Sequence, residues 1–135
     1  MKVLLDTQCW LWMNEGPERF SSAARALIER PQTELLLSAA SAWEIAIKYA
    51  VGKLTLPAHP ADYVPGRLKQ TRTTALAISH EHALRTCELP LHHRDPFDRL
   101  LAAQAQIERL PLLTADRQFA AYDLDVIWAL AAGSS

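Results

Sequence analysis

The sequence contains few of the residues on which several specialised protein classes depend. Only two of the 135 residues are cysteines, Cys9 and Cys87, and their spacing fits neither a disulfide framework nor a zinc site. Free thiols are typical of the reducing cytosol, so we expect a cytoplasmic protein. No apolar run approaches the roughly 18 residues of a membrane span, and Asp6 interrupts the first apolar run too early for a signal peptide. We therefore expect no membrane association.

Glycine-dependent motifs are also missing. None of the four glycines belongs to a G-x-x-x-x-G-K-[ST] or G-x-G-x-x-G motif, which argues against a P-loop NTPase and a dinucleotide-binding fold. The G-x-S-x-G and H-E-x-x-H motifs are absent as well. Fourteen Lys and Arg against 15 Asp and Glu give a net charge of −1, which excludes nucleic-acid affinity based on bulk positive charge. A local basic rim remains compatible with this balance.

Short apolar segments alternate with amphipathic segments along the whole chain. Half of the residues are hydrophobic, and 135 residues suit one domain, 1–135, with a frayed end at 131–135. Such alternation predicts an α/β fold in three layers (α/β/α), with a mostly parallel central sheet of four to five strands. The predicted strands are 2–5, 34–38, 73–78, 111–114 and 124–128, and the predicted helices are 8–14, 21–30, 41–50, 61–70, 79–88 and 95–109.

Four acidic residues follow strands or begin helices. Asp6 and Asp116 come directly after predicted strands, and Glu44 and Asp98 lie near predicted helix starts. In open α/β sheets, ligands bind beyond the carboxyl ends of the strands. The helices that follow parallel strands begin at that same edge, so we expect the four carboxylates to converge in one cleft.

Four carboxylates at close range disfavour one another's ionisation unless a cation compensates them. An all-oxygen set of ligands suits Mg²⁺, and Mn²⁺ is also compatible. A divalent metal in such a site favours phosphoryl-transfer chemistry, because it polarises a phosphate oxygen and lowers the pKa of bound water.

Each of these acids also has a purely structural interpretation. Asp6 can begin a turn, and Asp116 can cap a short following helix. Glu44 can form a capping box with Ser41, which we expect to begin the third helix, or can pair with Lys48 four residues later. These alternatives remain open at the level of single residues.

The segment around residues 92–99 combines a helix start with basic side chains. Asp95 is expected to cap the helix and Asp98 to occupy its third position, which is ordinary chemistry for a helix start. A His92–His93 pair in a loop is more typical of solvated side chains than of metal ligands. Basic side chains that could contact a phosphate backbone are Lys48, His93, Arg94, Arg99 and Arg117.

Four segments together resemble a known family. The segments VLLDTQCWLW, SAASAWEIAIKYAVGKL, LPLHHRDPFDRLLAAQA and LPLLTAD occur in the order found in PIN-domain ribonucleases, and most closely resemble VapC-type toxins of bacterial type II toxin–antitoxin systems. The resemblance covers about residues 2–128. It implies a three-layer PIN-like fold, cleavage of RNA with Mg²⁺ or Mn²⁺, a homodimer, and a small antitoxin that covers the site, in some cases within a larger toxin–antitoxin assembly.

The resemblance also implies roles for single residues. The metal-binding and catalytic acids of the family fall on Asp6, Glu44, Asp98 and Asp116, and the hydroxyl positions beside the first and last acids fall on Thr7 and Thr114. Asp95 belongs to the same HHRDPFDR stretch and has at most a supporting role.

Two other functions remain as alternatives. The same fold could be a non-catalytic module that binds RNA or protein, although four intact acids argue against a pure phosphate binder. A metal-dependent phosphatase is the second alternative, but its aspartate nucleophile would favour a second acid two positions later, where this sequence has Gln8.

Overall fold

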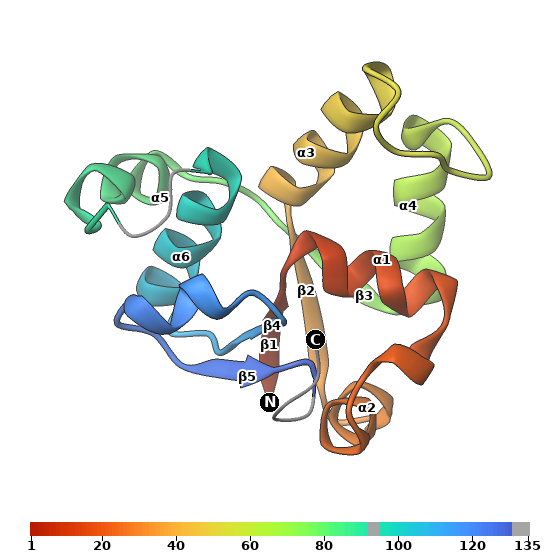
Figure 1. Ribbon diagram of the computed structural model, residues 1–135, viewed down its shortest axis with the longest axis horizontal. Helices are drawn as coiled ribbons and strands as arrows, with labels where there is room; N and C mark the ends of the chain where they lie inside the picture. The colour runs from red at the N-terminus through yellow and green to blue at the C-terminus, as the bar shows by residue number, and fades with distance from the viewer. Residues whose placement is uncertain (92–94, 131–135) are drawn as a thin grey trace.

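The computed structural model describes residues 1–91 and 95–130. Within these ranges, five parallel strands form one sheet in the order β3-β2-β1-β4-β5 (Figure 1). The predicted central parallel sheet is therefore confirmed. The strands are β1 (Lys2–Leu5), β2 (Glu34–Ser38), β3 (Thr73–Leu76), β4 (Leu112–Thr114) and β5 (Val126–Trp128).

The central strands are buried on both faces, which explains their continuous apolar runs. In β1, Val3 and Leu5 belong to one core cluster, whereas Leu4 between them belongs to a second cluster on the opposite face. The same alternation continues in β2, where Leu36 packs with Leu4. Strands with helices on both sides need apolar residues at every position.

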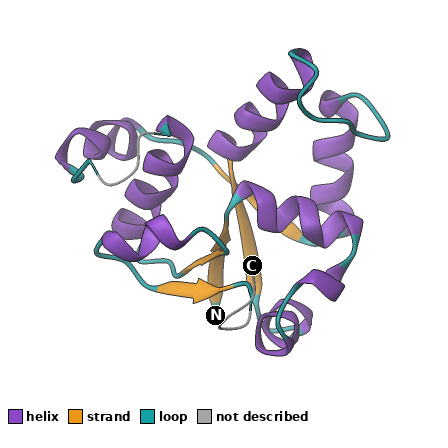
Figure 2. Cartoon of the chain, in the orientation of Figure 1, coloured by secondary structure: helices purple, strands orange, loops and turns teal. Residues whose placement is uncertain are grey.

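Helices cover both faces of the sheet. Figures 1 and 2 show α1, α3 and α4 on one side and α5 and α6 on the other, with the sheet between them. This arrangement confirms the three-layer α/β/α prediction. The helices are α1 (Thr7–Glu15), α2 (Ser22–Glu29), α3 (Ala39–Ala50), α4 (Pro60–Gln70), α5 (His80–Arg85) and α6 (Pro96–Glu108), with short 3-10 helices η1 (Pro17–Arg19), η2 (Thr86–Glu88) and η3 (Arg117–Ala121).

The start of α3 differs from the sequence-based prediction. The helix begins directly after β2, because the Ser38 hydroxyl accepts a hydrogen bond from the Ala40 backbone amide at 3.0 Å. Ser41 lies inside the helix and is fully buried, and its oxygen accepts a hydrogen bond from the Thr7 hydroxyl at 2.8 Å. The predicted capping box of Ser41 with Glu44 is therefore wrong.

Other boundaries differ by a few residues. The predicted helix 79–88 is α5 followed by the separate 3-10 helix η2, and the predicted strand 73–78 already ends at Leu76. Ser79 caps α5, since its side chain accepts a hydrogen bond from the His82 amide at 3.1 Å. The frayed end predicted for 131–135 falls outside the described residues. No helix in the described ranges is both long and apolar enough to cross a bilayer.

The strand order places a topological switch point at the centre of the sheet. From β1 the chain continues to β2 and β3 on one side, whereas β4 and β5 lie on the other side of β1. At such a point the segments leaving two neighbouring strands diverge and leave a crevice beyond their carboxyl ends. The segments that follow β1 and β4 begin with Asp6 and with Ala115–Asp116.

Candidate functional site

A hollow of about 380 Å³ lies at this switch point, and all four predicted acids line it. The chain therefore brings together carboxylates separated by up to 110 residues. Among the residues that the structure describes, the lining consists of Asp6, Thr7, Gln8, Glu44, Lys48, Asp95, Asp98, Ala115 and Asp116.

Asp6 is deeply buried, with only 7% of its surface exposed. One carboxylate oxygen caps α1 by accepting the Cys9 backbone amide at 2.7 Å, and the other accepts a short hydrogen bond from the Thr114 hydroxyl. Burial raises the pKa of Asp6 above its usual value; these hydrogen bonds oppose the rise, and the charge of Asp116 adds to it. A nearby cation would relieve the cost of ionising Asp6.

Thr114 connects the two strand-end acids. Its hydroxyl donates to Asp6 and accepts from the Asp116 backbone amide at 3.0 Å. The Asp116 side chain in turn caps η3 by accepting the Gln118 amide at 3.0 Å. The capping interpretation of Asp116 therefore holds, and the capping bond also fixes the carboxylate beside Asp6.

Glu44 enters the hollow from α3 and is also 7% exposed. Its Oε2 lies 2.8 Å from Nζ of Lys48, one helical turn later. Of the two structural interpretations of Glu44, the pairing with Lys48 is thus the one that the structure shows.

The start of α6 supplies two further carboxylates. Asp95 caps the helix, and its Oδ1 accepts from the amides of Phe97 at 2.8 Å and Asp98 at 3.3 Å. Asp98 lies in the first turn, where the helix dipole favours negative charge. The cap predicted for Asp95 is confirmed, and Asp95 also lines the hollow.

The side chains of the hollow fit a hard divalent cation. Most of their donors are carboxylate and hydroxyl oxygens, which Mg²⁺ and Mn²⁺ prefer, and a neighbouring cation would favour the ionised form of Asp6, whose pKa burial raises. Within residues 1–91 and 95–130, no three Asp, Glu, His or Cys side chains already enclose a position for an ion. The donor set therefore suits a cation that keeps several waters and takes one or two carboxylates, as Mg²⁺ commonly does.

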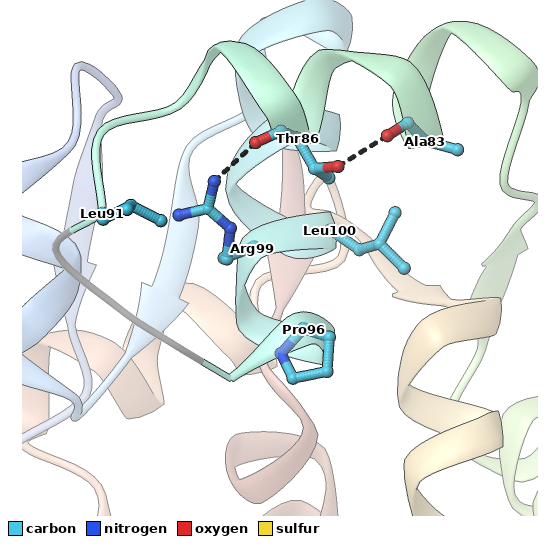
Figure 3. A pocket seen from close by; sticks show the side chains of 6 residues that line it. All are labelled: Ala83, Thr86, Leu91, Pro96, Arg99 and Leu100. Carbon is cyan, nitrogen blue, oxygen red and sulfur yellow. Dashed lines mark hydrogen bonds between the residues drawn. The ribbon is translucent and has the colours of Figure 1, made fainter.

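The predicted basic residues do not gather in the same way. Lys48 lines the hollow, whereas Arg117 stacks over the Trp128 ring at 4.4 Å. Arg99 donates to the backbone carbonyls of Leu89 and Pro90 at 3.2 and 3.0 Å, and lines a different cavity (Figure 3). The structure thus does not bring Arg99 to the acids. His93 and Arg94 lie outside the described residues.

That second cavity, of about 670 Å³, lies between α5 and η2 on one side and the start of α6 on the other. In Figure 3 the Arg99 side chain points toward the Thr86 carbonyl, and the Thr86 hydroxyl points toward Ala83. These contacts attach the segment after α5 to α6. Arg99 therefore holds the segment after α5 against α6, and its role in RNA contact stays a prediction.

Sequence reasoning missed two features around the hollow. Gln8 lines the hollow next to Asp6. From the sequence we considered Gln8 only as the position at which a phosphatase would have a second acid. Trp43, which is 57% exposed, contacts Phe97 edge-on at 5.2 Å between ring centroids, and so links α3 to the start of α6 beside the acids. No local pattern indicates this contact, since it depends on how the two helices pack.

Comparisons with known proteins agree with this geometry. A family model described as PIN domain matches residues 3–124. The curated protein Ribonuclease VapC16 of Mycobacterium tuberculosis (strain ATCC 25618 / H37Rv) is 48% identical over 58 residues. These residues are 43% of this chain and only 41% of the relative, so the match spans about two fifths of that protein's length.

Solved structures of similar fold cover nearly the whole chain. VapBC2 from Rickettsia felis, bound to a DNA fragment from its promoter, matches 95% of this chain and 98% of that chain with a TM-score of 0.70 and 18% identity. DNA-bound VapBC from Salmonella typhimurium matches the same shares with a TM-score of 0.66 and 18% identity. At this level of identity the two structures support the fold.

Proposed function

Since the chain belongs to the PIN domain family, we propose that it is an Mg²⁺-dependent endoribonuclease and the toxin of a toxin–antitoxin pair. The observation that carries the proposal is the hollow at the β1–β4 switch point, where acids from four distant segments meet. The name of the similar curated protein, a ribonuclease, supports RNA as the substrate.

The residues of the hollow have distinct roles in this proposal. Asp6 and Asp98 would hold the principal Mg²⁺, directly or through water, and Mn²⁺ could replace it. When bound, the cation supplies charge that polarises a phosphate oxygen and lowers the pKa of water. Asp116 and Glu44 complete the acidic lining and orient water. Thr114 fixes the Asp6 carboxylate through its hydroxyl.

Thr7 and Asp95 hold in place the helices that carry these acids. Thr7 links α1 to α3 through Ser41, and Asp95 fixes the first turn of α6 that carries Asp98. Attack of water on the phosphorus leaves a 5′-phosphate and a 3′-hydroxyl end, and it requires no histidine base. This product chemistry distinguishes the reaction from metal-free cleavage through the 2′-hydroxyl.

RNA binding is proposed to be modest and sensitive to salt, because the chain has a net charge of −1. Arg117 at the start of η3 is a candidate for phosphate contact, next to Asp116. Specificity then depends on the shape of the RNA and a few basic contacts rather than on bulk charge.

A small antitoxin is the proposed protein partner. The structures of similar fold are VapBC complexes, and a basic side chain of a partner would complement the negative hollow. Trp43 and Ile47 are exposed apolar side chains on α3, the helix that carries Glu44, and they support a protein contact on this helix. We also propose a homodimer, as the family resemblance implies.

Chelation tests the proposed function directly. We expect the purified protein to cleave RNA in Mg²⁺, to lose cleavage in EDTA, and to regain it when Mg²⁺ or Mn²⁺ is added back. A 3′-labelled RNA with a 5′-hydroxyl end, run on a denaturing gel before and after treatment of the products with a 5′-phosphate-dependent exonuclease, measures both cleavage and end chemistry.

Other outcomes of this assay would contradict the proposal. RNA binding without cleavage under all metal conditions would favour the non-catalytic module. Turnover of small phosphate esters with intact RNA would favour the phosphatase, and cleavage that persists in EDTA would exclude the metal-dependent mechanism.

A further inference from the structure

Arg117 and Trp128 form a stacked pair at the edge of the sheet that carries the acids. The guanidinium carbon of Arg117 lies 4.4 Å from the centroid of the Trp128 ring, where an aromatic face attracts a cation. Trp128 ends β5 and pairs in register with Thr114, whose hydroxyl donates to Asp6. Arg117 directly follows Asp116, which lines the hollow. Each member of the pair therefore adjoins a residue that lines the hollow or holds one of its acids.

The guanidinium of Arg117 keeps its donors for a ligand. Among the described residues, no hydrogen bond or ion pair joins the Arg117 side chain to another group, and the side chain is exposed. Arg19 provides a contrast, because it also lies over a tryptophan ring, that of Trp12, but has the Glu15 carboxylate 3.7 Å away. An aromatic ring attracts the cation and occupies its N–H donors far less than a carboxylate does.

An anion with several oxygens suits this pair, since a guanidinium presents a planar fork of donors that matches phosphate geometry. The strand order places the pair relative to the acids. Lys48 lies on α3, which follows β2 on one side of β1, whereas Trp128 lies on β5, beyond β4 on the other side. An RNA strand with one phosphate at the β1–β4 crevice would therefore extend its next phosphate along this edge toward Arg117.

Building on the proposed function, we propose that Arg117 binds the RNA phosphate next to the one that is cleaved, and that Trp128 holds the guanidinium in place for it. Trp128 is in this view a positioning residue, which acts through Arg117. The aromatic face restricts the arginine before RNA arrives, so that less side-chain freedom is lost on binding. The pair contributes to RNA affinity and not to the chemical step, so its loss raises Kd and KM and leaves kcat nearly unchanged.

RNA binding without metal tests the role of Arg117. A short fluorescein-labelled single-stranded RNA of mixed sequence is titrated with protein in EDTA at low salt, and fluorescence anisotropy gives the Kd. We expect Arg117→Gln to raise the Kd about tenfold and to reduce the steepness of log Kd against log salt by about 0.7, the value for one phosphate contact on a single strand.

Variants of Trp128 test whether it acts through Arg117. Trp128→Leu should raise the Kd about threefold, and Trp128→Tyr, which keeps an aromatic face, should restore most of the affinity. In the Arg117→Gln background, Trp128→Leu should have no further effect on the Kd. A purely structural role of Trp128 would instead lower the affinity in both backgrounds. Circular dichroism checks that each variant is folded.

Arg19→Gln is the matched control. It removes the same charge from the other arginine–tryptophan pair, which lies beyond the end of α1 and does not line the hollow. This variant should bind RNA as the wild type does. Steady-state cleavage in Mg²⁺ adds a second measurement, in which Arg117→Gln and Trp128→Leu should raise KM and keep kcat within about twofold of the wild type.

Several results would overturn the inference on its own. They are an Arg117→Gln protein with the Kd and salt dependence of the wild type, an equal effect of Arg19→Gln, and a wild type that binds no RNA at low salt. A fall in kcat with unchanged KM and Kd would also contradict it. If the Kd values change as expected but no variant and no wild type cleaves RNA in Mg²⁺, the catalytic part of the proposed function is wrong and the phosphate contact stands.

Discussion

Asp6→Asn is expected to reduce RNA cleavage in Mg²⁺ by about 10³-fold while leaving the protein folded. The substitution removes a deeply buried charge from the hollow but keeps an oxygen that can accept a hydrogen bond from the Cys9 amide at the start of α1. Initial rates on a labelled RNA, with wild type and variant at equal concentration, measure the loss.

The same substitution should stabilise the metal-free protein. Because burial raises the pKa of Asp6, the folded state binds this proton more tightly than the unfolded state does. The free energy of unfolding of the wild type therefore falls as pH increases from the unfolded pKa through the folded pKa, and it stays lower at neutral pH. Asn carries no charge and avoids this loss.

Thermal unfolding separates the two effects. In EDTA at neutral pH, we expect a higher midpoint for Asp6→Asn than for wild type, and Mg²⁺ should stabilise the wild type more. Asp62→Asn, an exposed change on α4, controls for preparation and for net charge. Cleavage near the wild-type rate by the folded Asp6 variant would remove Asp6 from the site.

Asp98→Asn and Asp95→Asn should differ strongly, although both acids line the hollow from the start of one helix. Asn caps a helix about as well as Asp does, so Asp95→Asn keeps α6 and should reduce cleavage less than about tenfold. Asp98→Asn removes a proposed ligand of the cation and should reduce cleavage by about 10²-fold or more. Steady-state rates at saturating Mg²⁺ make the comparison.

Each variant removes one negative charge from the same turn, so a general electrostatic effect would affect both alike. Equal losses in the two variants would contradict the assignment of Asp98 as the principal ligand on this helix. A larger loss in Asp95→Asn would move the proposed metal position toward Asp95.

The strands and the convergence of the acids could be predicted because both follow from local patterns and one general rule. Leu35–Leu37 form a continuous apolar run that only a strand buried on both faces explains. Asp6 and Asp116 follow such strands directly, and parallel strands end at a common edge. Glu44 and Asp98 were expected at the same edge because helices that follow parallel strands begin there, and the resemblance to the family implied the same four acids.

Features that depend on packing could not be predicted in this way. Ser38 and Ser41 are both plausible helix caps. Ser38 is the actual cap because α3 begins directly after β2, which leaves Ser41 inside the helix. Arginine is a residue type that often contacts RNA, but the guanidinium of Arg99 donates hydrogen bonds to backbone carbonyls of the segment after α5. A linear pattern does not show which neighbours compete for such a side chain.

The most direct test of the account is the position of a bound cation. Crystals soaked in Mn²⁺ should show an anomalous difference peak in the hollow, in contact with Asp6 or Asp98 directly or through one water, and none in crystals of Asp6→Asn. A wild-type hollow without a peak at saturating Mn²⁺, or a peak only at another surface, would contradict the claim that these acids form a divalent-metal site.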